Sequence, residues 1–287
     1  MGKNYGFSFP KIDDFVNIIL GLGKGCYLWK RDLSRFFLQL PLDPFDYNKV
    51  GCVWRSQFFF FASYVWGCRH AGLNGQRVTT AVATIHRSIG KSTQYLSKEH
   101  GYTTDGNQSV SPSEFNTLNY SDDFAGAELI LSRANLSFEE MGCLLNKLGL
   151  IESLPKAESP NQIMKYLGIL FDTLKMEMRI DYEKCTELRL ELSKWLARTV
   201  ATKSEIQSIL GKLMWVAKAV RMSRCFVLRI IAETKTLKTQ KQKVTLSSEI
   251  RKDFLWWHTY MSIFNGVELI VPSFVSVQIA GDACTQV

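Results

Sequence analysis

The sequence predicts an α+β domain followed by a helical region. Up to about residue 180, short apolar or alternating segments typical of strands and hairpins lie between amphipathic helical segments. From residue 181 onward the apolar residues recur at helical spacing. The chain has 287 residues, of which 46% are hydrophobic, enough to bury a core and to form more than one subdomain. We therefore expect an α+β unit over 1–180, a helical unit over 181–265 and the start of a further domain over 266–287.

The first part of the chain is predicted to contain two helices and three strands. The helices are expected at 12–20 and from about residue 73, the second with Val78, Val82, Ile85 and Ile89 on one stripe; the strands are expected at 27–33 and in a hairpin over 50–65 that turns at 55–57. The glycines at 21–25 match neither phosphate-loop pattern, so they are interpreted as a helix end and turn. Residues 90–114 are polar and rich in Ser, Thr and Gly, which predicts an exposed insertion.

The second part begins with a hairpin around residues 119–123. It is followed by predicted elements in this order: a helix from Ser132 that Gly149 stops, a hairpin over 163–180, helices from 181, a helix opened by a capping box at Thr202–Glu205, a Lys-rich linker at 235–243, a helix from Ser247 and a strand at 274–280.

Charge is distributed unevenly along the chain. Residues 184–252 contain 16 Lys or Arg and 5 Asp or Glu, a net of +11, which leaves 19 basic and 22 acidic residues elsewhere, a net of −3. This asymmetry indicates a polyanion bound by the C-terminal part, although a solvated charged helical face explains the same pattern. The seven cysteines are unclustered, which argues for reduced thiols and against a zinc site. No apolar run reaches the roughly 20 residues of a membrane span, and no secretory signal is present, so an intracellular protein of cytoplasm or nucleus with no membrane partner is expected.

Three acids are the candidate catalytic residues. Asp122 and Asp123 are adjacent within a Tyr-x-Asp-Asp box that has apolar residues on both sides, and Asp32 ends the strand at 27–33. Carboxylates on neighbouring strands can share two Mg²⁺ ions roughly 3.5–4 Å apart, an arrangement that suits nucleotidyl transfer. Taken alone, the Asp-Asp pair is more readily explained as an ordinary turn between two strands.

Residues 30–42 resemble the first palm motif of reverse transcriptases, and Tyr120 to Asp123 resemble the Tyr-x-Asp-Asp hairpin of that family. Further motifs follow in the family's order over nearly the whole chain, most similar to those of DIRS-type retrotransposons. The resemblance implies an RNA-directed DNA polymerase with a polymerase palm (a ferredoxin/RRM-like antiparallel sheet with helices) and partial fingers, followed by a helical thumb/connection. It implies that Asp32, Asp122 and Asp123 hold two Mg²⁺ ions, or Mn²⁺, with Asp122 the main ligand of the hairpin and Asp123 its assistant. The implied partners are a dNTP and an RNA or DNA template-primer duplex.

The same resemblance implies roles for residues outside the acids. Lys156 would be the catalytic lysine that protonates the pyrophosphate leaving group. The nucleotide-binding residues would be Leu33 through its carbonyl, Phe37 as an aromatic gate against the 2′-hydroxyl, and Trp66, Gly67 and Arg69 in the glycine-containing loop; the primer-binding residues would be Tyr120, Tyr166, Leu167 and Gly168. Considered singly, Phe37 is explained by core packing and Lys156 by an ordinary surface position.

Two features depart from the family pattern. Val65 and Gly72 stand where the family's loop has proline, and only three cations, all lysines, precede Lys30, where basic fingers residues are expected. At the other end, residues 279–282 resemble the first strand of an RNase H-like domain, so a longer polyprotein with RNase H is expected. The alternatives are a catalytically inactive, truncated relic that only binds nucleic acid and, more distantly, a basic α+β binding protein unrelated to polymerases.

Overall fold

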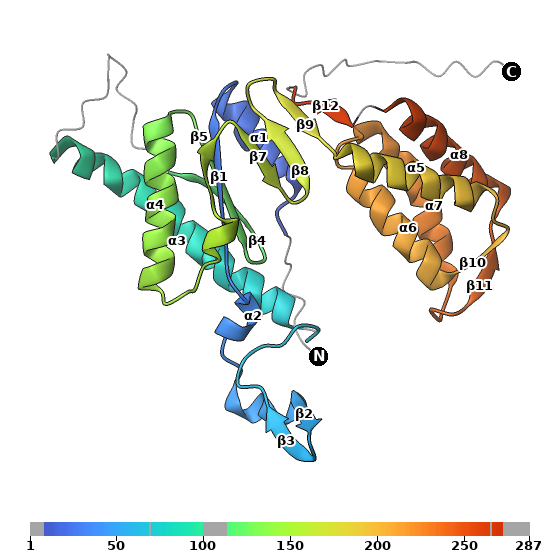
Figure 1. The fold of residues 1–287 in the computed structure, drawn as a ribbon, viewed down its shortest axis with the longest axis horizontal. Coiled ribbons are helices and arrows are strands. Elements are labelled where there is room, and N and C mark those ends of the chain that lie inside the picture. The colour runs from blue at the N-terminus through green and yellow to red at the C-terminus, as the bar shows by residue number, and fades with distance from the viewer. Residues whose placement is uncertain (1–8, 69, 100–113, 265, 272–287) are drawn as a thin grey trace, which may run out of the picture.

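The computed structural model describes residues 9–68, 70–99, 114–264 and 266–271. A β-rich part and a helical part lie side by side, on the left and right of Figure 1. The β-rich part contains α1 (Ile12–Leu22), β1 (Tyr27–Asp32), α2 (Phe36–Gln39), η1 (Pro44–Lys49), β2 (Gly51–Trp54), β3 (Gln57–Phe60), α3 (Ala71–Glu99), β4 (Asn116–Tyr120), β5 (Asp123–Glu128), α4 (Leu131–Lys147), η2 (Leu154–Lys156), β6 (Glu158–Asn161), β7 (Ile163–Tyr166), β8 (Ile169–Asp172), β9 (Glu177–Arg179) and β12 (Val267–Leu269). The helical part contains α5 (Tyr182–Leu196), β10 (Val200–Thr202), α6 (Lys203–Val216), η3 (Arg221–Arg224), α7 (Cys225–Thr236), β11 (Lys243–Thr245) and α8 (Ser248–Ile263).

A four-stranded antiparallel sheet of order β4-β5-β1-β6 forms the centre of the β-rich part. Its strands and the two helices α3 and α4 follow one another as β1-α3-β4-β5-α4-β6, which is the chain order of the ferredoxin-like arrangement. Both sides of the β4–β5 hairpin are therefore held by neighbouring elements, with β1 beside β5 and α3 against β4.

Strand β1 is buried on both faces because its alternating side chains enter two different cores. Trp29 packs with residues of α3 and α4, whereas Leu28 packs with residues of α1 and of the second sheet. Gly126 faces Trp29 across the sheet, and a Cβ there would lie 2.2 Å from the indole, so the position admits only glycine.

A second antiparallel sheet, of order β12-β9-β8-β7, lies beside the first. Strand β12 pairs with β9 from Val267↔Arg179 to Leu269↔Glu177. The first residues of the segment 266–287 therefore complete this sheet, while the strand expected at 274–280 and Asp282 lie outside the described residues.

Helices α5 to α8 enclose their own core, and the predicted capping box at the start of α6 is confirmed. Thr202 Oγ1 accepts from Glu205 N, and the Glu205 carboxylate accepts from Thr202 N. Ser247 likewise caps α8, as expected. The Lys-rich stretch predicted as a linker does connect two elements over residues 237–242, although its ends belong to α7 and β11; helix α7 was not predicted as a separate element.

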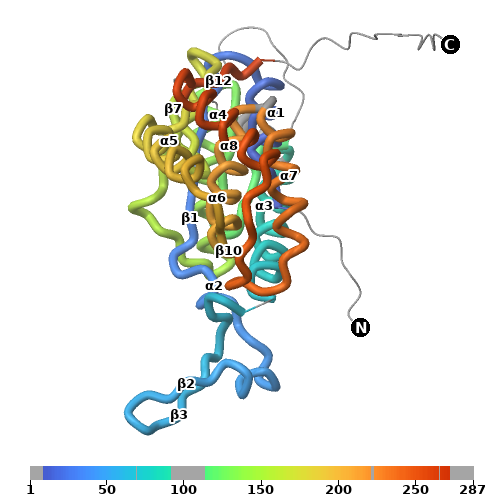
Figure 2. Tube along the Cα trace, turned by 90° about the vertical axis from the view of Figure 1, so that its right-hand side faces the viewer, coloured from blue at the N-terminus to red at the C-terminus, as the bar shows by residue number. Residues whose placement is uncertain are grey.

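The β2–β3 hairpin turns at Arg55 and Ser56, as predicted, and projects away from the rest of the molecule (Figures 1 and 2). All eight residues of its two strands are exposed.

Helix α3 differs from the expectation in two ways. It continues through Glu99, so the predicted insertion at 90–114 begins as helix, and residues 100–113 lie outside the described part. Val78 and Ile85 of the predicted apolar stripe are exposed, whereas polar Gln76, Thr79 and His86 are buried. The side of α3 that faces the sheet is thus partly polar.

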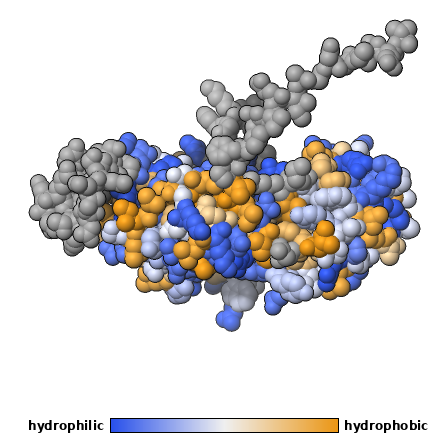
Figure 3. Space-filling model, turned by 90° about the horizontal axis from the view of Figure 1, so that it is seen from above, coloured by the Kyte–Doolittle hydropathy of each residue, from blue (hydrophilic) through white to orange (hydrophobic). Residues whose placement is uncertain are grey.

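Seen from above, hydrophobic residues gather over the middle of the molecule and a large hydrophilic area covers the end of the helical part (Figure 3). Within the described ranges, no helix combines the length and the hydropathy that crossing a bilayer requires.

Candidate active site

Two carboxylates face each other where β1 ends and β5 begins. Asp32 and Asp123 are register partners, and directly paired residues of antiparallel strands point to the same face of a sheet. Burial, a hydrogen bond to Asp32, and repulsion by Asp122 and Asp32 together raise the pKa of Asp123 to about 7. Asp32 itself is only 5% exposed. The pair therefore shares a partly dry site in which two negative charges repel near neutral pH.

Asp122 lies in the two-residue turn between β4 and β5. The preceding residue, Ser121, has a φ of +55°. The backbone carbonyl of Asp122 accepts from Leu33 N at 3.0 Å, which ties the turn to the end of β1. All three predicted acids are thus at one end of the sheet. The residue paired with Asp32 is Asp123; the expectation that Asp122 is the main metal ligand of the hairpin stays a prediction.

Lys156 is the cation that contacts Asp32. Its Nζ lies 3.0 and 3.2 Å from the two carboxylate oxygens of Asp32. The hydrogen bond and attraction to Asp32, with smaller contributions from Asp122 and Asp123, raise the pKa of Lys156. The lysine therefore stays protonated at neutral pH. Its side chain is 64% exposed, so it can leave Asp32 for another anion.

Phe37, in the short helix α2 that follows β1, forms an aromatic contact with Trp66. Their ring centroids are 5.5 Å apart, and Trp66 is 88% exposed. Gly75 of α3 lets Phe37 approach, because a Cβ there would lie 2.7 Å from the ring of Phe36 and 3.1 Å from that of Phe37. Leu33, by contrast, has a buried side chain, so only its backbone can reach a ligand.

The loop that follows Trp66 has a backbone that suits glycine. Gly67 has a φ of +94° and nothing within 4 Å of the position of a Cβ. Arg69 lies outside the described residues, so its expected role in nucleotide binding stays a prediction.

The predicted primer-binding residues come from two hairpins. Tyr166 ends β7 with 3% exposure, and burial followed by the charge of Asp123 raises its pKa. Leu167 and Gly168 form the β7–β8 turn with φ values of +48° and +83°. Tyr120 is half-buried at the end of β4, with its ring centroid 5.2 Å from that of Phe9.

The β7–β8 turn also contacts the helical part. Trp215 of α6 donates from Nε1 to Leu167 O at 3.4 Å, and its ring would lie 3.3 Å from a Cβ at Gly168. Lys184 of α5 lies over the same ring, 4.8 Å from its centroid. The helical part is thereby attached next to the site.

Sequence reasoning missed a polar layer beneath the acids. Gln76 of α3 bonds the backbone of the β4–β5 hairpin, and Asn119 Nδ2 donates to Thr79 Oγ1 at 3.0 Å and Thr80 Oγ1 at 3.1 Å. The signal that could have revealed it is the set of polar residues at helical spacing on α3, whereas the prediction relied on the apolar stripe of the same helix.

The acids suit a divalent cation held jointly with a substrate. No group of three or more His, Cys, Asp or Glu side chains in the described ranges could hold a metal ion on its own. Mg²⁺ at phosphate-transfer sites is usually held by one or two carboxylates, with water and substrate phosphates as its other ligands. Asp32 and Asp123 supply two such carboxylates, and a cation would relieve their repulsion. An all-oxygen donor set also suits Mg²⁺ or Mn²⁺.

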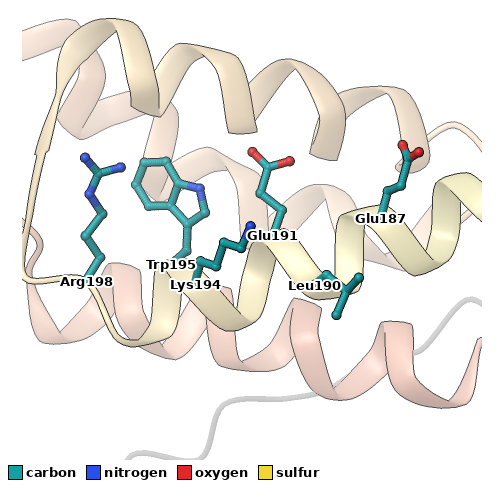
Figure 4. Close-up of a pocket in the computed structure, with 6 residues that line it drawn as sticks. All are labelled: Glu187, Leu190, Glu191, Lys194, Trp195 and Arg198. Atoms are coloured by element: carbon teal, nitrogen blue, oxygen red, sulfur yellow. The ribbon is translucent and has the colours of Figure 1, made fainter.

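A separate surface pocket lies along α5. It is lined by Glu187, Leu190, Glu191, Lys194, Trp195 and Arg198 (Figure 4). Arg198 lies over the ring of Trp195, 5.3 Å from its centroid, and Glu191 pairs with Lys212. None of the predicted site residues belongs to this pocket.

The fold is that of a reverse transcriptase. The chain is similar to solved structures of the foamy viral protease-reverse transcriptase: the dRH form in complex with double-stranded DNA (TM-score 0.57, 14% identity, 91% of this chain and 39% of that chain), the complex with dsDNA (0.52, 13%, 90% and 45%) and the complex with an RNA/DNA hybrid (0.50, 15%, 83% and 27%). The chain spans less than half the length of these proteins. No protein-family profile and no curated protein sequence matches it.

Proposed function

We propose that this chain is the polymerase portion of an RNA-directed DNA polymerase, which transfers a nucleotidyl group from a dNTP to a primer 3′-hydroxyl. The observation that carries the proposal is the Asp32–Asp123 pair, with Asp122 beside it, at the end of a central antiparallel sheet in a reverse-transcriptase-like fold. The order of the sequence motifs supports the finer assignment to a DIRS-type retrotransposon.

The acids and Lys156 would divide the chemistry between them. Two Mg²⁺ ions, or Mn²⁺, held by Asp32, Asp122 and Asp123 would neutralise charge at the attacking hydroxyl and the triphosphate. The 3′-hydroxyl would lose its proton to solvent water as its oxygen forms a bond to the α-phosphorus and the bond from that phosphorus to pyrophosphate breaks. Lys156 Nζ holds the proton that the departing pyrophosphate takes up, and its exposure lets it turn from Asp32 toward that oxygen.

The aromatic contact and the two hairpins would position the substrates. Phe37, packed against Trp66, would exclude a 2′-hydroxyl, with Leu33, Gly67 and Arg69 holding the rest of the nucleotide. The primer end would lie against Tyr120, Tyr166, Leu167 and Gly168.

The two parts of the molecule would act as palm and thumb. The β-rich part, with β2–β3 as partial fingers, would be the palm, and the helical part would be the thumb/connection that follows an RNA or DNA template-primer duplex. The net charge of +11 over residues 184–252 supports phosphate contacts of this kind, which are largely blind to sequence.

Primer extension with the full chain tests the proposal. Mg²⁺, a primed RNA template and dNTPs should give synthesis that Asp32→Asn and Asp123→Asn each reduce by on the order of 10²–10³, because each removes a preorganised charge. The loss of primer extension in Asp122→Asn, compared with the losses in Asp32→Asn and Asp123→Asn, shows whether Asp122 contributes equally to activity. Asp46→Asn, which changes an exposed carboxylate paired with Lys49, is the matched control and should keep wild-type activity. Undiminished extension by the first two variants would overturn the metal-binding role.

A second candidate function is nucleic-acid binding without synthesis. It is favoured by the β2–β3 hairpin, whose eight strand residues are all exposed rather than packed as part of a substrate enclosure. This function predicts that duplex affinity persists with a steep dependence on salt while incorporation stays at background. Measurable dNTP turnover by the wild-type chain would exclude it.

A further inference from the structure

A single glutamine side chain lies directly beneath the turn that carries the acids. Gln76 of α3 is 1% exposed. Its Oε1 accepts from Ser121 N at 2.6 Å, and its Nε2 donates to Asn119 O at 3.1 Å. One side-chain amide thus bonds the backbone on both sides of Tyr120.

The turn requires such support because its own hydrogen-bond ladder ends there. The last paired residues of the hairpin are Tyr120 and Asp123, so Ser121 N has no strand partner. Ser121 also adopts a φ of +55°, a conformation that residues with a side chain rarely occupy. A partly buried backbone N–H without a partner is unfavourable, and Gln76 supplies the partner.

The tether determines where the carboxylates lie. Asp122 directly follows Ser121, whereas Asp32 has contacts that the turn does not make: its carbonyl accepts from Ser153 N at 2.7 Å, and its carboxylate accepts from Lys156. A displaced turn would therefore move Asp122 relative to Asp32 and its register partner Asp123. We propose that Gln76 is a positioning residue that sets the geometry of the three carboxylates, and so their affinity for a divalent cation; this rests on the proposed function.

Position 76 requires a side-chain amide, because its side chain needs one hydrogen-bond donor and one acceptor. It must accept from Ser121 N and donate to Asn119 O at the same time. Gln76→Glu keeps the acceptor but opposes a carboxylate to a carbonyl oxygen, and Gln76→Met keeps the length while removing both bonds. The two variants therefore separate the two hydrogen bonds.

Backbone hydrogen exchange on the full chain tests the tether itself. Exchange at the Ser121 amide should become about tenfold faster in Gln76→Met, the change expected for losing one buried hydrogen bond, and less so in Gln76→Glu. Gln162→Met is the matched control, because Gln162 Nε2 donates to a backbone carbonyl, Gly25 O, away from the acids. Unchanged exchange at Ser121 would refute the tether.

Cation affinity tests the positioning role. Mn²⁺ binding followed by electron paramagnetic resonance should weaken about tenfold in Gln76→Met and stay unchanged in Gln162→Met. The Mg²⁺ concentration for half-maximal extension should rise by a similar factor, while the KM for dNTP and the duplex Kd stay within about twofold. A purely structural role would lower the active fraction without moving either cation midpoint, and that result would overturn the proposal. If the wild-type chain binds Mn²⁺ but extends no primer, the proposed function fails, and the shift in Mn²⁺ affinity still decides the role of Gln76.

Discussion

At the scale of single residues, Phe37 is explained by core packing when considered singly, whereas in the structure its ring contacts the exposed ring of Trp66. Its ring is neither fully buried nor free, since it rests on Phe36 and on exposed Trp66. If it borders the nucleotide, Phe37→Ala should raise ribonucleotide incorporation relative to deoxynucleotide incorporation by on the order of 10- to 100-fold, because a steric barrier to the 2′-hydroxyl is removed. The ratio of kcat/KM for rNTP and dNTP measures this.

Leu38→Ala provides the control for that prediction. Leu38 follows on the same short helix α2 and is 51% exposed, so its truncation removes a comparable apolar side chain without touching the contact. An equal change in selectivity in both variants would show that Phe37 packs as core only.

His86 makes the stability of the protein depend on pH. It is fully buried between Thr117 Oγ1 and Ser137 O, at 2.8 Å from each, and burial lowers its pKa to about 4. In the unfolded chain the His86 imidazole binds a proton near pH 6.5, whereas in the folded chain it stays neutral down to about pH 4. The free energy of unfolding should therefore fall as the pH drops from about 6.5 to about 4, by about 3 kcal/mol from this group.

Urea unfolding at several pH values measures the effect. His86→Gln should be less stable at neutral pH, because it loses well-aligned bonds, yet lose less further stability on acidification than the wild type. His258→Gln is the control, since His258 bonds to exposed Ser193 on the helical part. If both variants keep the wild-type slope, His86 does not govern the loss of stability in acid.

At the scale of elements, a buried ion pair joins α7 to α8. Arg229 donates from Nε to Asp253 at 2.9 Å and also reaches it through Nη2; Asp253 is fully buried, whereas Arg229 is 47% exposed. Removing the arginine leaves the buried Asp253 carboxylate without its partner, so Arg229→Met should lower the free energy of unfolding clearly.

The reverse change should have the smaller effect. Asp253→Asn leaves an arginine that water can reach, and a cost of about 1–3 kcal/mol is expected. Denaturant titration compares the two variants with Glu249→Gln, which changes the exposed partner of Arg229 and should stay within about 0.5 kcal/mol of wild type. If Asp253→Asn lowered the free energy of unfolding more than Arg229→Met, the assignment of the buried charge to Asp253 would be contradicted.

At the scale of the whole molecule, the end of the helical part displays several exposed lysines. Lys235, Lys238, Lys241 and Lys243 are exposed, and no side-chain partner is found for them in the described part of the chain. They lie from the last turn of α7 to the first residue of β11, at the β10–β11 end of the helical part (Figure 1). If this end contacts duplex phosphates, Lys238→Gln and Lys241→Gln together should reduce the slope of log K against log salt by up to about 1.8.

Lys91→Gln is the control for this measurement. Lys91 lies on α3 in the β-rich part and already pairs with Glu114, so its loss should leave the slope unchanged. Equal slopes for all variants, measured by fluorescence anisotropy over a salt series, would place the duplex elsewhere.

Features that depend on a few neighbouring residues were predictable from the amino-acid sequence. They are the capping box at Thr202, the turn at Arg55 and Ser56, the strand that ends in Asp32 and the Asp-Asp hairpin, because spacing and turn chemistry act over short distances along the chain. Three features became visible only in the folded chain: Asp123 is the register partner of Asp32, Gln76 bonds the turn, and β12 joins the sheet of β7–β9. Strand register and the buried face of a helix also depend on partners far along the chain, and periodicity within one element does not identify those partners.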